Sequence, residues 1–135
     1  MMGKIITFIV FVIMLTGCGK TTSVGMKEYP PLNEFNSKTD YLKAADVIYS
    51  MAQYCGGGLY TVEREDFKGV DKSVVRLKLN GFPSGYYMHV DVDKLNESES
   101  KIKVYHYYQT DVTQKMAYTV QEWVNNNSKT CVVGF

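Results

Sequence analysis

Apolar residues recur at intervals of three and four between residues 41 and 55, which is the period of one face of an α-helix. The members of this face are Tyr41, Ala44, Ala45, Ile48, Met51, Ala52 and Cys55. Thr39 or Asp40 can cap the start of the helix, and the run of glycines at 56–58 ends it. The narrow apolar face predicts a helix that packs on a sheet.

Four segments after this helix are rich in β-branched and aromatic residues and are separated by turn residues, which predicts four strands. They are Leu59 to Glu63, Val74 to Leu79, Tyr86 to Val92 and Ile102 to Tyr108. Short connections favour antiparallel neighbours, so we expect a four-stranded meander. Apolar and polar residues alternate in it, as at Met88, Val90 and Val92, so one face should be buried and the other wetter.

A second helix is predicted over about Asp111 to Asn125, with Thr110 or Asp111 as its cap. Its apolar side carries Val112, Met116, Val120 and Trp123 or Val124. We expect both helices to cover the buried sheet face, and residues 131–133 to form a possible short edge strand. The predicted fold is a two-layer α+β sandwich with the element order α-β-β-β-β-α.

The first eighteen residues have a different pattern: Lys4, an apolar run from Ile5 to Met14, and then Leu15-Thr16-Gly17-Cys18. A basic start followed by roughly ten apolar residues is typical of a secretory signal peptide, and the run is too short to remain as a membrane span. The last four residues resemble the lipobox of bacterial prolipoproteins. The alternative is an ordinary secretory leader with an incidental cysteine.

The lipobox resemblance implies that residues 1–17 are cleaved and that Cys18 becomes the lipidated first residue of the mature protein. It implies diacylglycerol on the thiol and a further acyl chain, such as palmitate, on the new amino terminus. Several acyl chains make membrane attachment effectively permanent. Because Gly19 rather than Asp follows the cysteine, the resemblance favours the outer membrane, with the domain facing the periplasm.

Residues 18–38 are rich in Gly, Thr, Ser, Lys and Pro, which predicts a flexible lipidated tether before a single domain over 39–135. About twenty extended residues span at most roughly 65 Å. Loss of the leader removes Lys4 from the 15 basic residues and none of the 14 acidic ones, so the mature chain is neutral. A basic footprint for nucleic acid is therefore missing, and we expect no nucleic-acid partner.

With Cys18 assigned to lipid, Cys55 and Cys131 remain, at the end of the first predicted helix and just after the last one. An exported protein meets an oxidising compartment, so we predict that these two cysteines form a disulfide that links the helical elements. A redox-active pair is the alternative, but it lacks the close Cys-x-x-Cys spacing that lowers a thiol pKa.

The sequence carries no catalytic motif, and we expect a protein that is not an enzyme and has no cofactor. The best candidate chemistry is His89-x-Asp91-x-Asp93, whose alternation points three possible metal ligands to one face of a strand. Successive residues on that face lie about 6.6–6.8 Å apart, too far for all three to reach one ion, so we expect a solvated strand face and no metal site. His106 alternates with Ile102 and Val104 and is expected to be a core histidine.

Tyr87, His89, Tyr105 and Tyr107 are expected to share the outer sheet face, where exposed tyrosines suit binding. Cross-strand tyrosine pairs that merely stabilise the sheet are the alternative, and in the other strand register Tyr105 and Tyr107 would be core residues. We predict a membrane-anchored accessory or assembly module that contacts another envelope component through this face. The alternative function is binding of a small ligand, glycan or peptidoglycan fragment there.

Overall fold

The computed structural model describes residues 25–81 and 85–135. The predicted leader and Cys18 lie outside the described residues. In chain order the elements are η2 (Gly25–Glu28), β1 (Asn33–Ser37), α2 (Tyr41–Gly56), β2 (Tyr60–Phe67), η3 (Lys68–Val70), β3 (Lys72–Leu79), β4 (Gly85–Lys94), β5 (Ser100–His106) and α3 (Asp111–Asn126), where η marks a 3₁₀ helix. The α+β class is confirmed.

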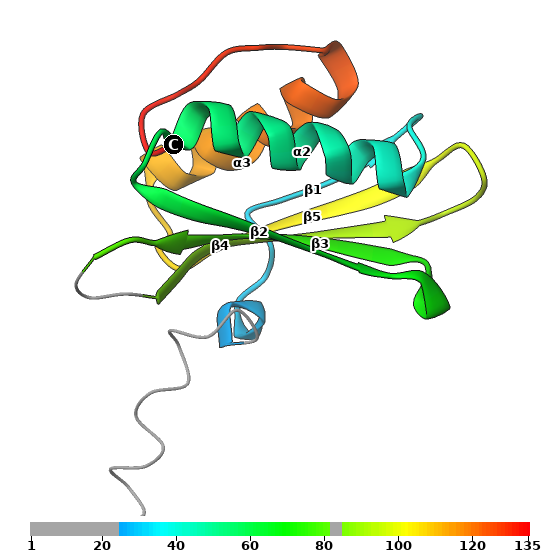
Figure 1. The fold of residues 1–135 in the computed structure, drawn as a ribbon, viewed down its shortest axis with the longest axis horizontal. Helices are drawn as coiled ribbons and strands as arrows, with labels where there is room; N and C mark the ends of the chain where they lie inside the picture. The colour runs from blue at the N-terminus through cyan, green and yellow to red at the C-terminus, as the bar shows by residue number, and fades with distance from the viewer. Residues whose placement is uncertain (1–24, 82–84) are drawn as a thin grey trace, which may run out of the picture.

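The sheet has five antiparallel strands in the order β1-β5-β4-β3-β2. The prediction of four strands in the order α-β-β-β-β-α is therefore wrong in detail, because β1 precedes α2 and adds an edge strand beside β5 (Figure 1). Strand β1 lies within residues 18–38, the range predicted as a tether. It was missed because Phe35 is the only apolar residue of Asn33–Ser37.

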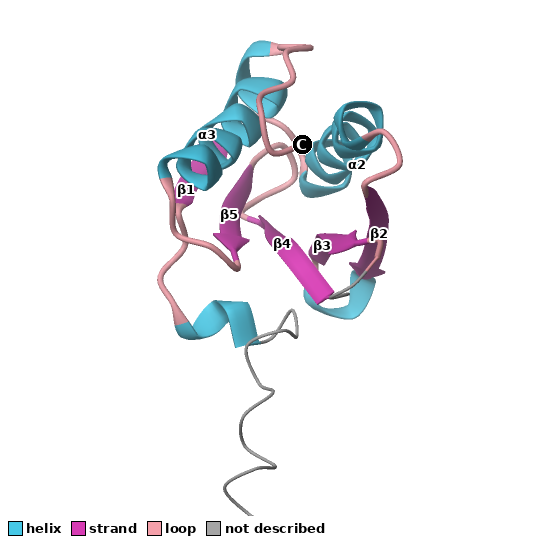
Figure 2. Cartoon of the chain, turned by 90° about the vertical axis from the view of Figure 1, so that its left-hand side faces the viewer, coloured by secondary structure: helices cyan, strands magenta, loops and turns pink. Residues whose placement is uncertain are grey.

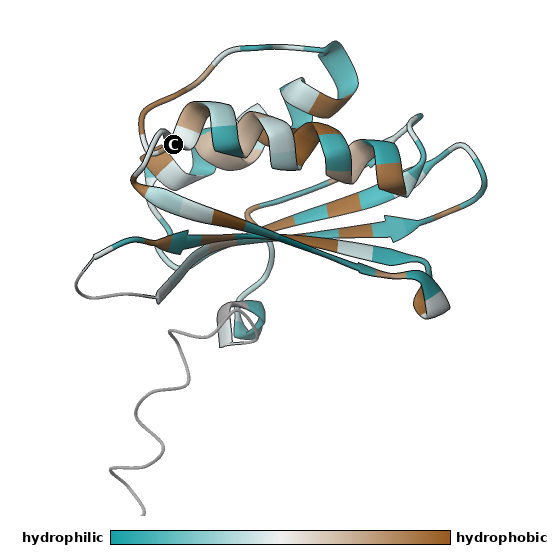
Figure 3. Cartoon of the chain, viewed as in Figure 1, coloured by the Kyte–Doolittle hydropathy of each residue, from teal (hydrophilic) through white to brown (hydrophobic). Residues whose placement is uncertain are grey.

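Both long helices lie on one face of the sheet, here called the inner face (Figures 1 and 2). The apolar residues predicted to line it, including Leu77, Met88 and Val90, are fully buried in one core with Ile48 and Trp123. Figure 3 shows apolar residues recurring along α2 and along the strands, and the buried helix residues belong to the same core as the strand residues. The predicted alternation of β3 and of most of β4 is thus confirmed.

Both helices begin at residues named from the sequence as possible caps. The Asp40 side chain accepts hydrogen bonds from the Leu42 and Lys43 amides at the start of α2. At α3, the Thr110 hydroxyl accepts from the Thr113 amide, and the Thr113 hydroxyl accepts from the Thr110 amide. These bonds satisfy backbone donors that have no partner inside the helix.

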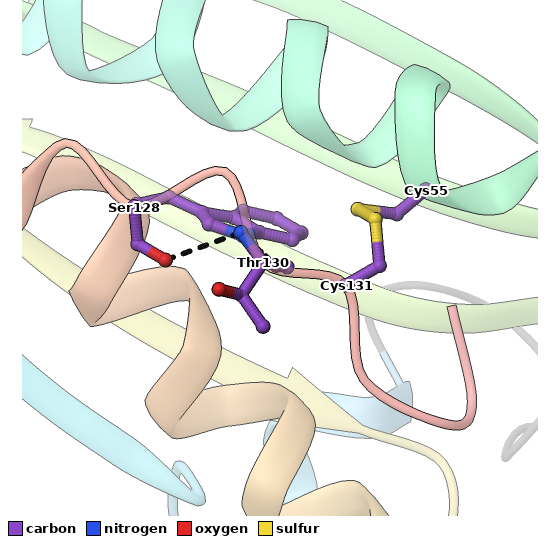
Figure 4. Close-up of a disulfide and its surroundings, with 5 residues drawn as sticks. Cys55, Ser128, Thr130 and Cys131 are labelled. Atoms are coloured by element: carbon purple, nitrogen blue, oxygen red, sulfur yellow. Dashed lines mark hydrogen bonds between the residues drawn. A yellow bond between two sulfur atoms is a disulfide. The ribbon is translucent and has the colours of Figure 1, made fainter.

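The predicted disulfide is present, with Cys55 in the last turn of α2 and Cys131 in the segment after α3 (Figure 4). It therefore joins α2 to the C-terminal segment. The Trp123 indole donates to the Thr130 carbonyl beside it at 2.8 Å, and Phe135 packs on Trp123 with ring centroids 4.7 Å apart. The prediction of a possible edge strand at 131–133 was wrong, because this segment turns back over the helices and pairs with none of the described strands.

The other sheet face, here called the outer face, is partly covered by η2 (Figures 1 and 2). This short helix precedes β1 and lies on the opposite side of the sheet from α2 and α3. Its Lys27 reaches Asp91 of β4, and the helix packs against β5. A segment of the predicted tether is therefore part of the folded domain.

Candidate functional site

The outer face is built mainly from charged side chains on neighbouring strands. Arg76 of β3 lies opposite His89 of β4, and Lys72 lies opposite Asp93. Because side chains alternate along a strand, these residues project away from the core residues Met88 and Val90. The charges are paired across strands, as between Lys101 and Glu34, whose side-chain atoms lie 2.8 Å apart.

Asp91 is the centre of a buried charge network on this face. It is 3% exposed. The Lys27 ammonium lies 2.7 Å from one carboxylate oxygen, while Nε2 of His89 at 2.8 Å and the Lys72 ammonium at 3.3 Å approach the other. Burial of a carboxylate is costly unless it is paired and hydrogen-bonded, and here three side chains from η2, β3 and β4 supply those contacts.

The two central groups are held in defined protonation states. Burial disfavours the charged form of Asp91, but hydrogen bonds from His89 and Lys27 outweigh it and hold the pKa of Asp91 far below its usual range. Burial lowers the pKa of His89, although the neighbouring Asp91 opposes this effect. The pair is therefore a carboxylate and a neutral imidazole that donates its Nε2 proton.

A neutral histidine that donates from Nε2 has a lone pair on Nδ1. Nδ1 of His89 is buried and has no hydrogen-bond partner among the described residues. The same holds for the Nε–H group of Arg76, the register partner of His89, although the Nη1 atom of Arg76 lies 3.1 Å from Glu65. An unpartnered acceptor and an unpartnered donor thus lie on adjacent strands of one face.

His89 and Arg76 line a pocket of about 270 Å³ on the outer face, here called the His89 pocket. Its complete lining is Lys27, Phe67, Val70, Lys72, Val74, Arg76 and His89. The apolar members come from the end of β2, from η3 and from β3. The three cations line the pocket, whereas their carboxylate partners Asp91, Asp93 and Glu65 do not.

Two of the four predicted contact residues, His89 and Tyr105, lie together on the outer face, with ring centroids 6.0 Å apart. Neither is an open platform, because Tyr105 is 9% exposed and His89 is 3% exposed. The Lys27 ammonium lies 5.9 Å from the Tyr105 ring centroid, so η2 contributes to covering this pair. The expectation of an exposed Tyr105 surface was wrong.

Tyr87 does not share that face. The pairing of β3 with β4 shifts between Leu77 and Lys78, so that Lys78 lies opposite Tyr86 and Tyr87 becomes the extra residue of a β-bulge. Tyr87 consequently packs on the inner side, against the core and next to the sulfur of Met116 in α3. Tyr86 takes the outer position, where it donates to Glu63 at 2.9 Å.

Tyr107 follows the end of β5 and lies away from the His89–Tyr105 pair. Its amide donates to the Tyr87 carbonyl at 3.0 Å, and its ring meets the exposed Tyr108 edge to face. The predicted four-residue contact face therefore divides into a covered outer pair, His89 and Tyr105, and the residues Tyr87 and Tyr107, which lie side by side near the start of β4. The tyrosines alone do not form a single surface.

His106 belongs to the core, as expected, and is 1% exposed. Its Nδ1 atom accepts from the Tyr108 amide at 3.2 Å, which places the neutral ring's proton on Nε2. The Tyr87 ring packs against it edge to face, with centroids 4.0 Å apart. Burial lowers the pKa of His106 to about 4, so it is a structural imidazole that opposes protonation.

Within residues 25–81 and 85–135, no three His, Cys, Asp or Glu side chains are grouped so that they could hold a metal ion. The Asp93 carboxylate lies 3.9 Å from the Lys72 ammonium and does not form such a group with His89 and Asp91. Across the same described residues, no helix is long and apolar enough to cross a membrane.

The sequence did not single out Lys27, Lys72 and Arg76, the cations of the His89 pocket. Lys72 and Arg76 could have been found from the alternation of β3 once its register against β4 was known. Lys27 could not, because it lies within the segment predicted as a tether. No protein-family model matches this chain, and no curated protein sequence matches it.

Proposed function

We propose that the protein is a lipoprotein, anchored through Cys18 in the outer membrane and facing the periplasm, that serves as a non-catalytic accessory module. It contacts another envelope component through the outer face of its sheet. The observation that carries this proposal is the position of η2, because the chain that leads to Cys18 enters the domain on the outer face.

The docking of η2 shortens the proposed tether. Only residues 19–24 separate Cys18 from Gly25, so seven steps between α-carbons span at most about 25 Å. This is far less than the 65 Å reach expected if residues 19–38 were all extended. The outer face would therefore lie close to the bilayer, where a partner in or on the same membrane can reach it.

Exposed positions remain on this face beside the covered centre. Glu34 of β1 and Thr61 and Glu65 of β2 are exposed and lie at its two edges. An edge strand presents unpaired backbone groups as well as side chains, so either edge offers a partner both kinds of contact. The inner face has no such role, because the two helices cover it.

The anchor is tested by labelling cells with a radioactive fatty acid and comparing the natural protein with Cys18→Ser. Label in the natural protein and none in the variant are expected. The contact is tested by immunoprecipitating the protein from detergent-solubilised envelopes. Thr61→Arg on the outer face should lose a co-isolated component that Glu122→Arg on the exposed side of α3 retains; equal recovery with both variants would contradict the proposed face.

A second candidate function, binding of a small ligand or an envelope fragment, is favoured by the His89 pocket. The pocket is lined by residues with buried polar atoms that have no partner among the described residues, which is unusual in a purely structural surface. The predicted stacking of a sugar on Tyr87 and Tyr105 is not the basis of this candidate, because Tyr87 packs inside and Tyr105 is covered.

A further inference from the structure

We infer that the His89 pocket binds a small carboxylate whose neighbouring carbon bears a hydrogen-bond donor and an apolar group. This inference rests on the second candidate function proposed above and names the ligand chemistry for that site. Free α-hydroxy acids and N-acylated amino acids, including the carboxyl ends of peptides, share this arrangement of atoms.

The donor requirement comes from His89. Nε2 of His89 lies 2.8 Å from a carboxylate oxygen of Asp91 and donates its proton to it, so Nδ1 has a lone pair. The side chain is almost fully buried and lines the pocket, while Nδ1 has no partner among the described residues. A buried acceptor without a donor costs about 1–3 kcal/mol, so a ligand O–H or N–H group placed there would recover that free energy.

The carboxylate requirement comes from the basic residues. Arg76 lies directly opposite His89, and its Nε–H donor is buried and unpartnered within the described chain. Lys72 lies 3.3 Å and 3.9 Å from the carboxylates of Asp91 and Asp93, so neither contact is a short ion pair. Both cations line the pocket, and a carboxylate beside Arg76 would form charge-assisted hydrogen bonds.

The apolar requirement comes from Val74, Phe67 and Val70. Val74 of β3 lines the pocket and is 2% exposed, whereas Phe67 at the end of β2 and Val70 of η3 line it and are 37% and 72% exposed. Burying their exposed surface against a ligand is favourable at about 25 cal/mol per Å². With a volume of about 270 Å³, the pocket suits a ligand of roughly the size of one aromatic amino acid.

Isothermal titration calorimetry on the full protein, purified from the producing cells in mild detergent, tests this inference. The first probe is 3-phenyllactate, which has all three groups. The matched controls are 3-phenylpropanoate, which lacks the donor, and 1-phenylpropan-2-ol, which lacks the carboxylate. We expect 3-phenyllactate to bind at least about fivefold more tightly than either control, since one hydrogen bond contributes about 1 kcal/mol and each 1.4 kcal/mol is tenfold in affinity.

N-acetylphenylalanine distinguishes the two sources of this chemistry. Tighter binding of N-acetylphenylalanine supports a peptide carboxyl end as the ligand, and tighter binding of 3-phenyllactate supports a free hydroxy acid. Both results agree with the inference.

Two variants locate the site. Arg76→Lys keeps the charge but removes the Nε–H donor, and it should weaken 3-phenyllactate at least fivefold. Lys103→Met removes a cation of the same face that does not line the pocket and should leave affinity unchanged. The Nδ1 resonance of His89 in nitrogen NMR should shift on binding, even if Arg76→Lys is too unstable to assay.

The inference fails in two distinguishable ways. Equal affinity for 3-phenyllactate and 3-phenylpropanoate would overturn the proposed ligand chemistry while leaving the second candidate function in place. No saturable binding of any probe, with no shift at His89, would overturn both. The accessory contact proposed through the outer face is tested separately by co-isolation and would stand in either case.

Discussion

Protonation of His106 should destabilise the domain in mild acid. The ring is 1% exposed, and burial lowers its pKa from 6.5 to about 4. Between these two values the unfolded chain binds a proton that the folded chain does not, so the free energy of unfolding falls as the pH falls. Each pH unit contributes about 1.4 kcal/mol, so the loss reaches about 3 kcal/mol at pH 4, while the full contribution is present above pH 6.5.

Urea unfolding of the natural protein and of His106→Phe at several pH values between 7.5 and 4 measures this loss. Phenylalanine fills the same space beside Tyr87 but cannot take up a proton. The variant lacks the hydrogen bond that the Tyr108 amide donates to His106, and this loss lowers its free energy of unfolding by a similar amount at every pH. His89 titrates in both proteins, so the difference between the two curves isolates His106.

Between pH 7.5 and pH 4, the free energy of unfolding should fall by about 3 kcal/mol more in the natural protein than in the variant. Parallel curves for the two proteins would refute the reasoning, because they would show that His106 binds protons equally in the folded and unfolded chains. A steeper curve for the variant would refute it as well.

Three further predictions concern stability. Cys131→Ser should lower the free energy of unfolding by at most about 4.5 kcal/mol in urea, since the disulfide closes a loop between residues 76 apart, and Ser128→Ala is a mild control. Lys27→Met should raise the pKa of Asp91, which carboxyl-carbon NMR measures, and should lower the free energy of unfolding by about 2 kcal/mol. No change in that pKa would show that η2 does not dock on the sheet in solution. Thr110→Ala should cost about 1 kcal/mol by thermal unfolding through loss of the α3 capping box, and a change below 0.3 kcal/mol would contradict that role.

The helices and the inner face could be predicted from sequence because their apolar periods are regular. Strand β1 could not, because its inward residues Asn33 and Ser37 are polar. The Asn33 amide instead donates to the Ala117 carbonyl at 3.3 Å and to the Gln121 side chain at 3.0 Å. Long-range bonds of this kind satisfy a buried polar side chain but leave no periodic signal in the sequence.

The candidate site was only partly accessible from sequence, for two physical reasons. A bulge at Tyr87 reverses the alternation at one end of β4, and it depends on the pairing with β3 rather than on a local motif. Docking of η2 then covers Tyr105 and brings Lys27 to Asp91. The chemically unusual feature is that Nδ1 of His89 is buried and has no partner within the part of the chain that the structure describes, and no sequence pattern signals it.

In-cell photocrosslinking tests the proposed outer-face contact most directly. A photoreactive residue at Glu34 or Glu65 probes the two exposed edges of the outer face, and one at Glu122 probes the exposed side of α3. We expect a photoreactive residue at Glu34, Glu65 or both to capture a discrete envelope component that one at Glu122 does not. Capture of a component from Glu122 alone would contradict the proposed outer-face contact and would place the contact on the helical side.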